Sequence, residues 1–238
     1  MTSFGTKVVI VLLILLTQGC ASTPTKKLEV AENAKIGVMF RTNENPLYVH
    51  VGTTMFQNET RFLDESWELE AYTIKYLESA LKPDVSVELI NSEALTSANQ
   101  IVDAGWSSLT LTKELEPELS KLASERNLSV LLIIDKYEAS VEANSTVTAE
   151  GYGVFTRCML GICHAEPLRN VAVRVFSLDP AMYITSGNYT NSVFQALVET
   201  ELPNIPEKIS PEAIEVVKNE FFTIFSKEID YALERSGL

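Results

Sequence analysis

LEPELSKLASERNLSVLLII, residues 115–134, is the stretch that decides the fold of this chain. Its first part carries apolar residues at helical spacing: Leu115, Leu119, Leu122 and Ala123. Asn127 is typical of the left-handed position at which a helix ends. Residues 130–134 are apolar without interruption, which indicates a strand buried on both faces. The sequence therefore predicts a helix that leads into a central strand of a covered sheet, and so an α/β (α+β) fold.

A long helix is predicted at the C-terminal end. Ser210, Pro211 and Glu212 supply a capping serine, a proline at the first helical position and an acid in the first turn. The apolar stripe that follows consists of Ile214, Val217, Phe221, Phe225 and Ala232. This pattern predicts a helix of about 25 residues that ends before Gly237 and packs on the sheet containing residues 130–134.

The remaining elements follow from shorter patterns. We expect strands at 35–40, 85–90, 137–148 with 151–155, 171–176 and 183–193, helices after 64–66 and 91–93, and a loop from 41 to about 64. The result is a mixed sheet of about five strands covered by helices, with a long C-terminal helix and a protruding β-hairpin.

The N-terminal residues have the pattern of an export signal. Lys7 precedes an apolar run, residues 8–16, which is too short to span a bilayer, for which ~20 residues are needed. Gly19-Cys20 then resembles the bacterial lipobox, although Thr17 stands where leucine is usual. The resemblance implies cleavage before Cys20, lipid on its sulfur and an acyl chain such as palmitate on its amine. Ala21, the residue after the cysteine, resembles that of lipoproteins sorted to the outer membrane. The alternative to the whole interpretation is an ordinary cleaved signal without lipid attachment.

Three segments follow from this interpretation: a signal peptide at 1–19, a lipidated cysteine with its linker at 20–34, and a single periplasmic domain at 35–238. Lys7 is the only charged residue of the signal, so cleavage would change the formal net charge from −13 to −14. An acidic chain is unsuited to nucleic acid, whose phosphates require a basic surface. We therefore expect membrane attachment through the lipid on Cys20 and not through surface charge.

Three stretches carry a resemblance to a known family: KIGVMF (35–40), LSKLASERNLS (119–129) and VRVFSLDP (173–180). With the order of the elements, they resemble the periplasmic domain shared by the curli secretion lipoprotein CsgG, the N-terminal domain of TolB and the penicillin-binding-protein activator LpoB. The likeness covers roughly residues 35–235. A CsgG-type pore needs two long membrane-crossing hairpins, and residues 183–203 are too short to supply the second.

The sequence contains little that indicates catalysis. His50 and His164 lack zinc-binding spacing, and no nucleophile or phosphate-binding motif is present. Asp135, Glu138 and Glu142 are expected on a solvated face. We therefore predict no enzyme activity, no cofactor and no metal.

Cys158 and Cys163 enclose a four-residue turn between two strand-like segments. An exported protein meets an oxidising compartment, which favours a disulfide between them. Metal ligation together with His164, or free thiols, are the alternatives. Met159, Leu160 and Ile162 would be exposed apolar residues at this tip, so we expect them to contact a partner; otherwise the hairpin folds back on the core.

Taken together, these features predict an outer-membrane lipoprotein that faces the periplasm and acts as a non-enzymatic binding or assembly factor of the cell envelope. Its partner would be an envelope protein, and a homo-oligomer is compatible with the sequence. The alternatives are a subunit of a CsgG-like export channel and an envelope hydrolase with an unrecognised site.

Overall fold

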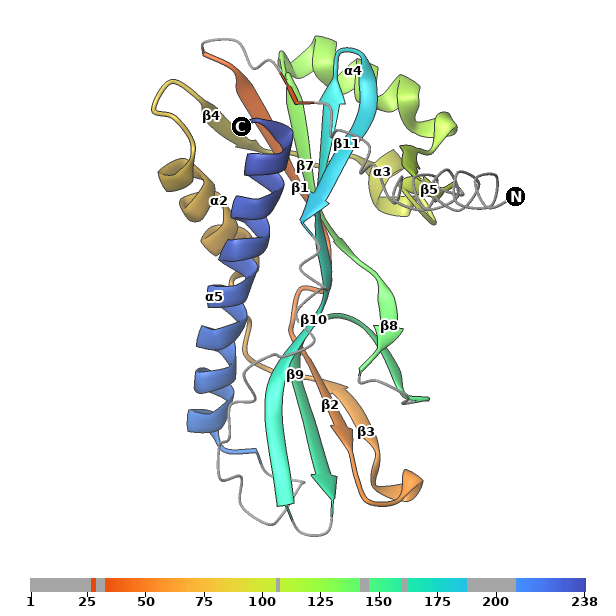
Figure 1. Cartoon of the computed structure of the whole chain (residues 1–238), viewed down its shortest axis with the longest axis vertical. Helices are drawn as coiled ribbons and strands as arrows, with labels where there is room; N and C mark the ends of the chain where they lie inside the picture. Colours follow the sequence, from red (N-terminus) through yellow and green to blue (C-terminus); the bar gives the residue numbers. More distant parts are fainter. Residues whose placement is uncertain (1–26, 29–32, 106–107, 142–145, 160–161, 188–208) are drawn as a thin grey trace, which may run out of the picture.

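A 17-residue strand, β10, runs through both halves of a mixed sheet and joins them (Figure 1). The structure, a computed structural model, describes residues 27–28, 33–105, 108–141, 146–159, 162–187 and 209–238. Its elements are, in order, β1 (Lys35–Arg41), β2 (Leu47–Val51), η1 (Met55–Gln57), β3 (Glu59–Phe62), α2 (Leu69–Ala80), β4 (Ser86–Leu89), α3 (Glu93–Ser97), β5 (Val102–Ala104), β6 (Leu109–Leu111), η2 (Lys113–Leu115), α4 (Glu116–Arg126), β7 (Val130–Lys136), β8 (Glu138–Ser140), β9 (Thr148–Met159), β10 (Ile162–Leu178), β11 (Ala181–Gly187) and α5 (Pro211–Ser236). The α/β class expected from the sequence is confirmed.

The strand order is β3-β2-β9-β10-β7-β1-β4, with β11 added to β10 and β8 added to β9. β1 runs parallel to β4 and β7, and β2 runs parallel to β9. The first part of β10 pairs with β9, and its second part pairs with β7 and β11. We call β2, β3, β9 and the first part of β10 the hairpin half, and β1, β4, β7, β11 and the second part of β10 the parallel half.

Helices cover both faces of the parallel half. α2 and α5 contribute to the core on one face, and α3 and α4 contribute to the core on the other. Strand β7 serves both cores, because Leu132 and Ile134 belong to the first and Leu131 and Ile133 to the second. This arrangement confirms that the apolar run at 130–134 lies in the middle of a covered sheet.

Helix α5 extends along both halves of the sheet. Its capping residue, Ser210, accepts a hydrogen bond from the backbone of Ala213, and Gly237 ends it in the left-handed conformation. Its 26 residues span about 39 Å. Val217 and Phe221 share one core with residues of β7, as predicted. At β11 the backbone comes so close that a Cβ on Gly187 would lie 2.1 Å from the carbonyl oxygen of Glu228.

The loop predicted for residues 41–64 is wrong, since β2 and β3 lie within it. Strand β2 is buried on both faces and β3 is exposed along its length, so neither has the apolar–polar alternation that marks a half-buried strand. β2 forms because residues 153–157 of β9 offer it a parallel partner. Gly153 permits this pairing, because a Cβ there would lie 1.9 Å from the carbonyl oxygen of Leu47.

Other boundaries also differ from the prediction. Within the described residues the sheet has nine strands and not about five. The long strand predicted at 137–148 is wrong: Glu138–Ser140 form β8, which pairs back onto the start of β9. β11 covers the described part of the strand predicted at 183–193, and the positions beyond Gly187 lie outside the described residues.

Candidate functional site

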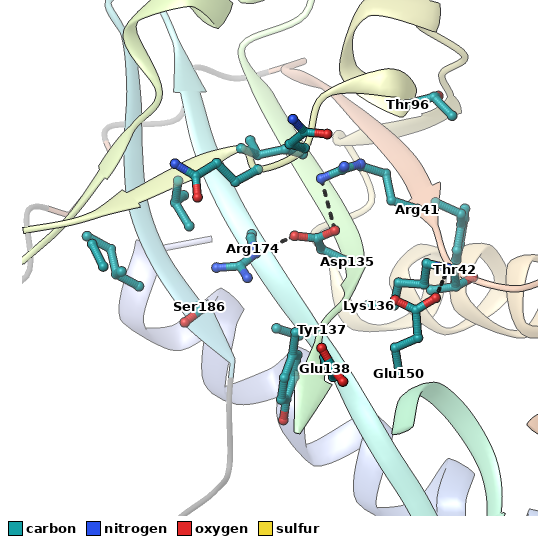
Figure 2. Close-up of a pocket in the computed structure, with 18 residues that line it drawn as sticks. Arg41, Thr42, Thr96, Asp135, Lys136, Tyr137, Glu138, Glu150, Arg174 and Ser186 are labelled. Carbon is teal, nitrogen blue, oxygen red and sulfur yellow. Dashed lines mark hydrogen bonds and ion pairs between the residues drawn. The ribbon is translucent and has the colours of Figure 1, made fainter. Parts of the chain in front are cut away.

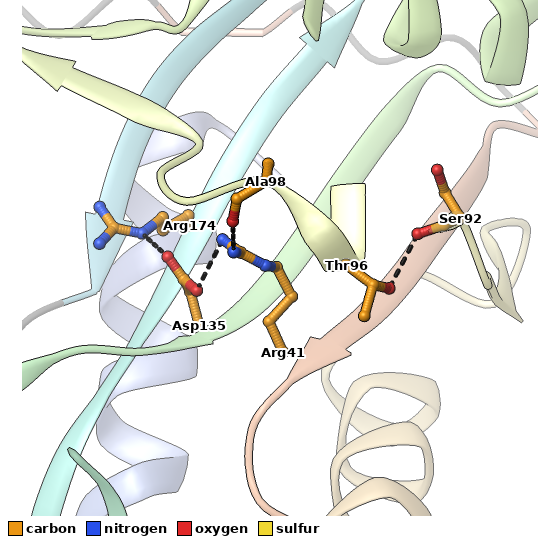
Figure 3. A network of polar contacts seen from close by, with 6 residues as sticks. All are labelled: Arg41, Ser92, Thr96, Ala98, Asp135 and Arg174. Atoms are coloured by element: carbon orange, nitrogen blue, oxygen red, sulfur yellow. Dashed lines mark hydrogen bonds and ion pairs between the residues drawn. The ribbon is translucent and has the colours of Figure 1, made fainter. Parts of the chain in front are cut away.

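A buried carboxylate lies between two arginines where the parallel strands end (Figure 3). Arg41 donates from Nη1 to Oδ1 of Asp135 over 3.1 Å, and Arg174 donates from Nε to Oδ2 over 2.9 Å. Asp135 is only 6% exposed, and both arginine side chains are largely buried. We call these three residues the Arg–Asp–Arg cluster.

Strand register brings the cluster together. Arg41 is the last residue of β1 and pairs with Asp135 of β7. Ala172 of β10 lies opposite Asp135, so Arg174, two residues further along, lies diagonally from it on the same face. That face also carries Ile133 and belongs to the core beneath α3 and α4. The cluster therefore forms the polar end of an apolar face.

The solvated face expected for Asp135 is wrong, because the two arginines cover and neutralise it. Glu138 is exposed, as expected, and Glu142 lies outside the described residues. Sequence reasoning missed this cluster. The available signal was Asp135 itself, a charge directly after an apolar run that is buried on both faces.

A cavity of about 810 Å³ opens at the cluster (Figure 2). It lies at the carboxyl ends of two parallel strands, which is the usual position of ligand sites in open α/β sheets. Gln100 and Ile101, from the segment after α3, and Leu109, the first residue of β6, also line it. Concave sites that combine apolar walls with a few placed polar groups are typical of small-molecule binding.

The two arginines differ in how many of their donors are used. Arg41 also donates from Nη2 to the carbonyl oxygen of Ala98, so its guanidinium is fixed on two sides. Arg174 is held only through Nε. Among the described residues, neither of its terminal nitrogens has a hydrogen-bond partner. In Figure 2 these two nitrogens point away from Asp135.

The cysteines predicted to form a disulfide lie at the far end of the hairpin half. Cys158 of β9 is opposite Cys163 of β10, and their sulfur atoms are at bonding distance. Met159 and Ile162 are the strand residues next to the turn. Their side chains, and the whole of Leu160, lie outside the described part of the structure, as does Cys20.

A second turn, between β2 and β3, lies beside this hairpin (Figure 1). Thr53 donates to the carbonyl oxygen of Cys158 over 3.4 Å, which connects the two turns. Met55 and Phe56 occupy the tip of the second turn and are 77% and 92% exposed. Phe62 of β3 is also exposed. We call Met55 and Phe56 the apolar tip; Phe62, which pairs with Leu47 at the end of β2 and β3 away from the turn, is not part of it. The sequence shows these residues without any steady period, so their common exposure could not be predicted from it.

A buried polar group lies between β2 and β9 in the same half. Thr156 donates to the hydroxyl of Tyr48 over 3.1 Å, and its Oγ1 lies 2.9 Å from Nδ1 of His50. The other ring nitrogen of His50 is buried without a partner in the described structure. Burial lowers the pKa of the His50 imidazole and raises the pKa of the Tyr48 hydroxyl. Burial therefore favours the neutral form of the His50 imidazole over its charged form.

Two searches of the described residues bear on metal and membrane contacts. No group of three or more histidine, cysteine, aspartate or glutamate side chains is placed to hold a metal ion there. None of the helices there combines the length and the apolar character required to cross a bilayer.

Comparison with known proteins gives little similarity. No family model matches the sequence, and no curated protein matches it. Among solved structures, the C-terminal domain of the coenzyme A biosynthesis bifunctional protein CoaBC is 11% identical, with a TM-score of 0.18. The alignment covers 86% of this chain and 99% of that domain. A TM-score this low carries no argument about fold or function.

Proposed function

We propose that this protein is a lipid-anchored, non-enzymatic binding factor of the bacterial outer membrane, and that its apolar tip contacts an envelope protein on the periplasmic side. The observation that carries the proposal is the exposure of Met55 and Phe56. Exposed apolar groups of this size, side by side, mark interaction sites on soluble domains. Methionine and phenylalanine are also enriched at protein interfaces.

The position of the tip relative to the tether supports a partner in the aqueous compartment. Leu28, close to the proposed lipid attachment, donates from its backbone to Ser236 at the C-terminal end of α5. The turns of the hairpin half lie at the opposite end of the molecule (Figure 1). A linker from Cys20 to Lys27 reaches about 25 Å at most, which is less than the length of α5. An upright domain would therefore hold the tip away from the bilayer.

The hairpin that carries Cys158 and Cys163 extends the same surface. Its contact with Thr53 joins it to the turn that carries Met55 and Phe56. A disulfide across β9 and β10 would restrict the shape of this hairpin before a partner binds, and such preorganisation lowers the entropic cost of binding.

Photo-crosslinking in intact cells tests the proposal. A photoreactive amino acid at Asn58, beside the tip, should give a discrete protein adduct from the full-length protein. The double change Met55→Ser and Phe56→Ser should abolish the adduct while the domain stays folded, because neither side chain is buried. Leu89→Ser, which removes an exposed apolar residue from edge strand β4, is the matched control and should leave the adduct unchanged.

Two results would contradict the proposal. The adduct could persist in the double variant, which would show that the apolar tip makes no contribution to the contact. The photoreactive group could instead capture lipid alone, which would make the tip a membrane contact.

A further inference from the structure

We propose that the cavity at the Arg–Asp–Arg cluster binds a small monocarboxylate, and that Arg174 holds its carboxylate group. This inference is independent of the protein partner proposed above, because the cavity lies in the parallel half and the apolar tip lies in the hairpin half. Four features of the cavity support it. They are the net charge of the cluster, the unused hydrogen-bond donors of Arg174, the apolar walls, and the pairing or solvent screening of the nearby acids.

The charge of the cluster favours a single negative charge on the ligand. Two guanidinium groups share one carboxylate, that of Asp135, so one positive charge is left in a partly dehydrated site. Interactions between charges are stronger there than in water. A carboxylate balances this remaining charge, whereas a phosphate dianion would leave an excess negative charge in a protein that is already acidic.

The donors are arranged for a two-point contact. The hydrogen bond from Nε to Asp135 fixes the plane of the Arg174 guanidinium, and the two terminal nitrogens are left without partners. A guanidinium presents parallel N–H groups whose spacing matches the two oxygens of a carboxylate. Arg41 has less to offer because Asp135 and Ala98 occupy its terminal nitrogens. Arg41 and Asp135 are therefore positioning residues, and Arg174 is the binding residue.

The walls of the cavity favour a ligand with an apolar body. Ile101, Val102 and Leu109 are among the residues that line the cavity. Leu109 is one of the exposed large apolar residues of the described structure. A ligand whose hydrocarbon part covered Leu109 would remove apolar surface from water while its carboxylate reached Arg174.

The acids that line the cavity do not cancel the positive charge. Glu150 is paired with Lys136 at 2.6 Å, so these two residues add no net charge. Glu138 is exposed and accepts a hydrogen bond from Thr148 over 2.6 Å. Solvent screens the charge of Glu138, whereas the Arg–Asp–Arg cluster is largely shielded from solvent.

Isothermal titration calorimetry on the full-length protein in detergent tests the proposal. The probe is 3-phenylpropionate, which joins a carboxylate to an apolar ring. We expect saturable binding at one site. Its uncharged counterpart, 3-phenylpropionamide, should bind at least tenfold more weakly, because it cannot neutralise the cluster. Phenyl phosphate should also bind more weakly than 3-phenylpropionate.

Variants assign the binding to Arg174. Arg174→Gln should weaken binding of 3-phenylpropionate at least tenfold. Arg174→Lys keeps the positive charge but not the planar fork, and should lie between Arg174→Gln and the unchanged protein. Arg126→Gln, which removes an exposed arginine outside the cavity, should have no effect. Thermal melting shows whether each variant is folded. If Arg174→Gln is unfolded, the affinity of Arg174→Lys is compared with that of the unchanged protein.

Several outcomes would overturn the proposal. They are an absence of saturable binding of 3-phenylpropionate, equal affinity for 3-phenylpropionamide, and full affinity in folded Arg174→Gln or Arg174→Lys. Tighter binding of phenyl phosphate than of 3-phenylpropionate would show that the cavity prefers a phosphate group to a carboxylate.

Discussion

Replacing Phe221 with alanine should remove a large share of the stability of the domain. Phe221 is fully buried on α5, and its ring lies 5.5 Å from the rings of Trp67, Tyr152 and Phe225, measured between centroids. Trp67 precedes α2, and Tyr152 is in β9. The side chain therefore connects α5 to two other parts of the chain, in a core that extends over both halves of the sheet.

The expected loss is about 3–5 kcal/mol, because truncation of a buried phenylalanine removes its transfer free energy and leaves a cavity that rigid neighbours fill only in part. Typical domains are stable by about 5–15 kcal/mol, so the variant should remain folded but close to its limit. With a urea dependence of about 2 kcal/mol per molar, the midpoint of unfolding should fall by about 1.5–2.5 M.

The matched control is Phe56→Ala, the same chemical change at a residue that is 92% exposed. It should alter the free energy of unfolding by less than about 0.5 kcal/mol. Urea unfolding followed by tryptophan fluorescence measures both variants, since Trp67 is in contact with Phe221. Equal midpoints for the two variants would refute the assignment of Phe221 to the core.

Three further predictions concern the anchor, the cysteines and acid stability. Cys20→Ala should abolish incorporation of labelled palmitate and release the protein from the membrane fraction; label retained on the variant would contradict the lipobox interpretation. Changing Cys158 and Cys163 to serine should cost ~2 kcal/mol, because the closed loop is short, and thiol titration of the native protein should find neither cysteine free. Burial keeps the pKa of His50 below that of the unfolded chain, 6.5, so the unfolded state binds more protons as the pH falls. The free energy of unfolding should therefore decrease below about pH 6.5, and His50→Gln should flatten this decrease. An unchanged pH profile in His50→Gln would assign the decrease to other groups.

The proposed contact surface could be predicted only in part. The turn spacing of Cys158 and Cys163 predicted that they lie opposite each other, because a short turn between two strands dictates its own register. The exposed tip at Met55 and Phe56 could not be predicted, since nothing nearby in the sequence indicates that β2 adds to β9.

The Arg–Asp–Arg cluster could not be predicted for a related reason. Arg41, Asp135 and Arg174 are far apart in the sequence; Arg41 and Asp135 lie near the ends of β1 and β7, whereas Arg174 lies within β10. Their charges meet only because β7 pairs with β1 on one side and with β10 on the other. A sequence of mixed charge contains many such combinations, and only strand pairing selects this one.

The sequence by itself determined the features that depend on local spacing. The helix that starts at Ser210, the αβ step at residues 115–134 and the α/β class follow from capping residues and apolar periods, which act within a few turns of chain. The tertiary structure decided what depends on pairing between distant strands. It made β10 a strand that joins both halves, placed β2 and β3 at the edge of the sheet, and buried Asp135 between two arginines. The physical reason is that a helix satisfies its backbone hydrogen bonds within one segment, whereas a strand needs a partner whose position the local sequence does not specify.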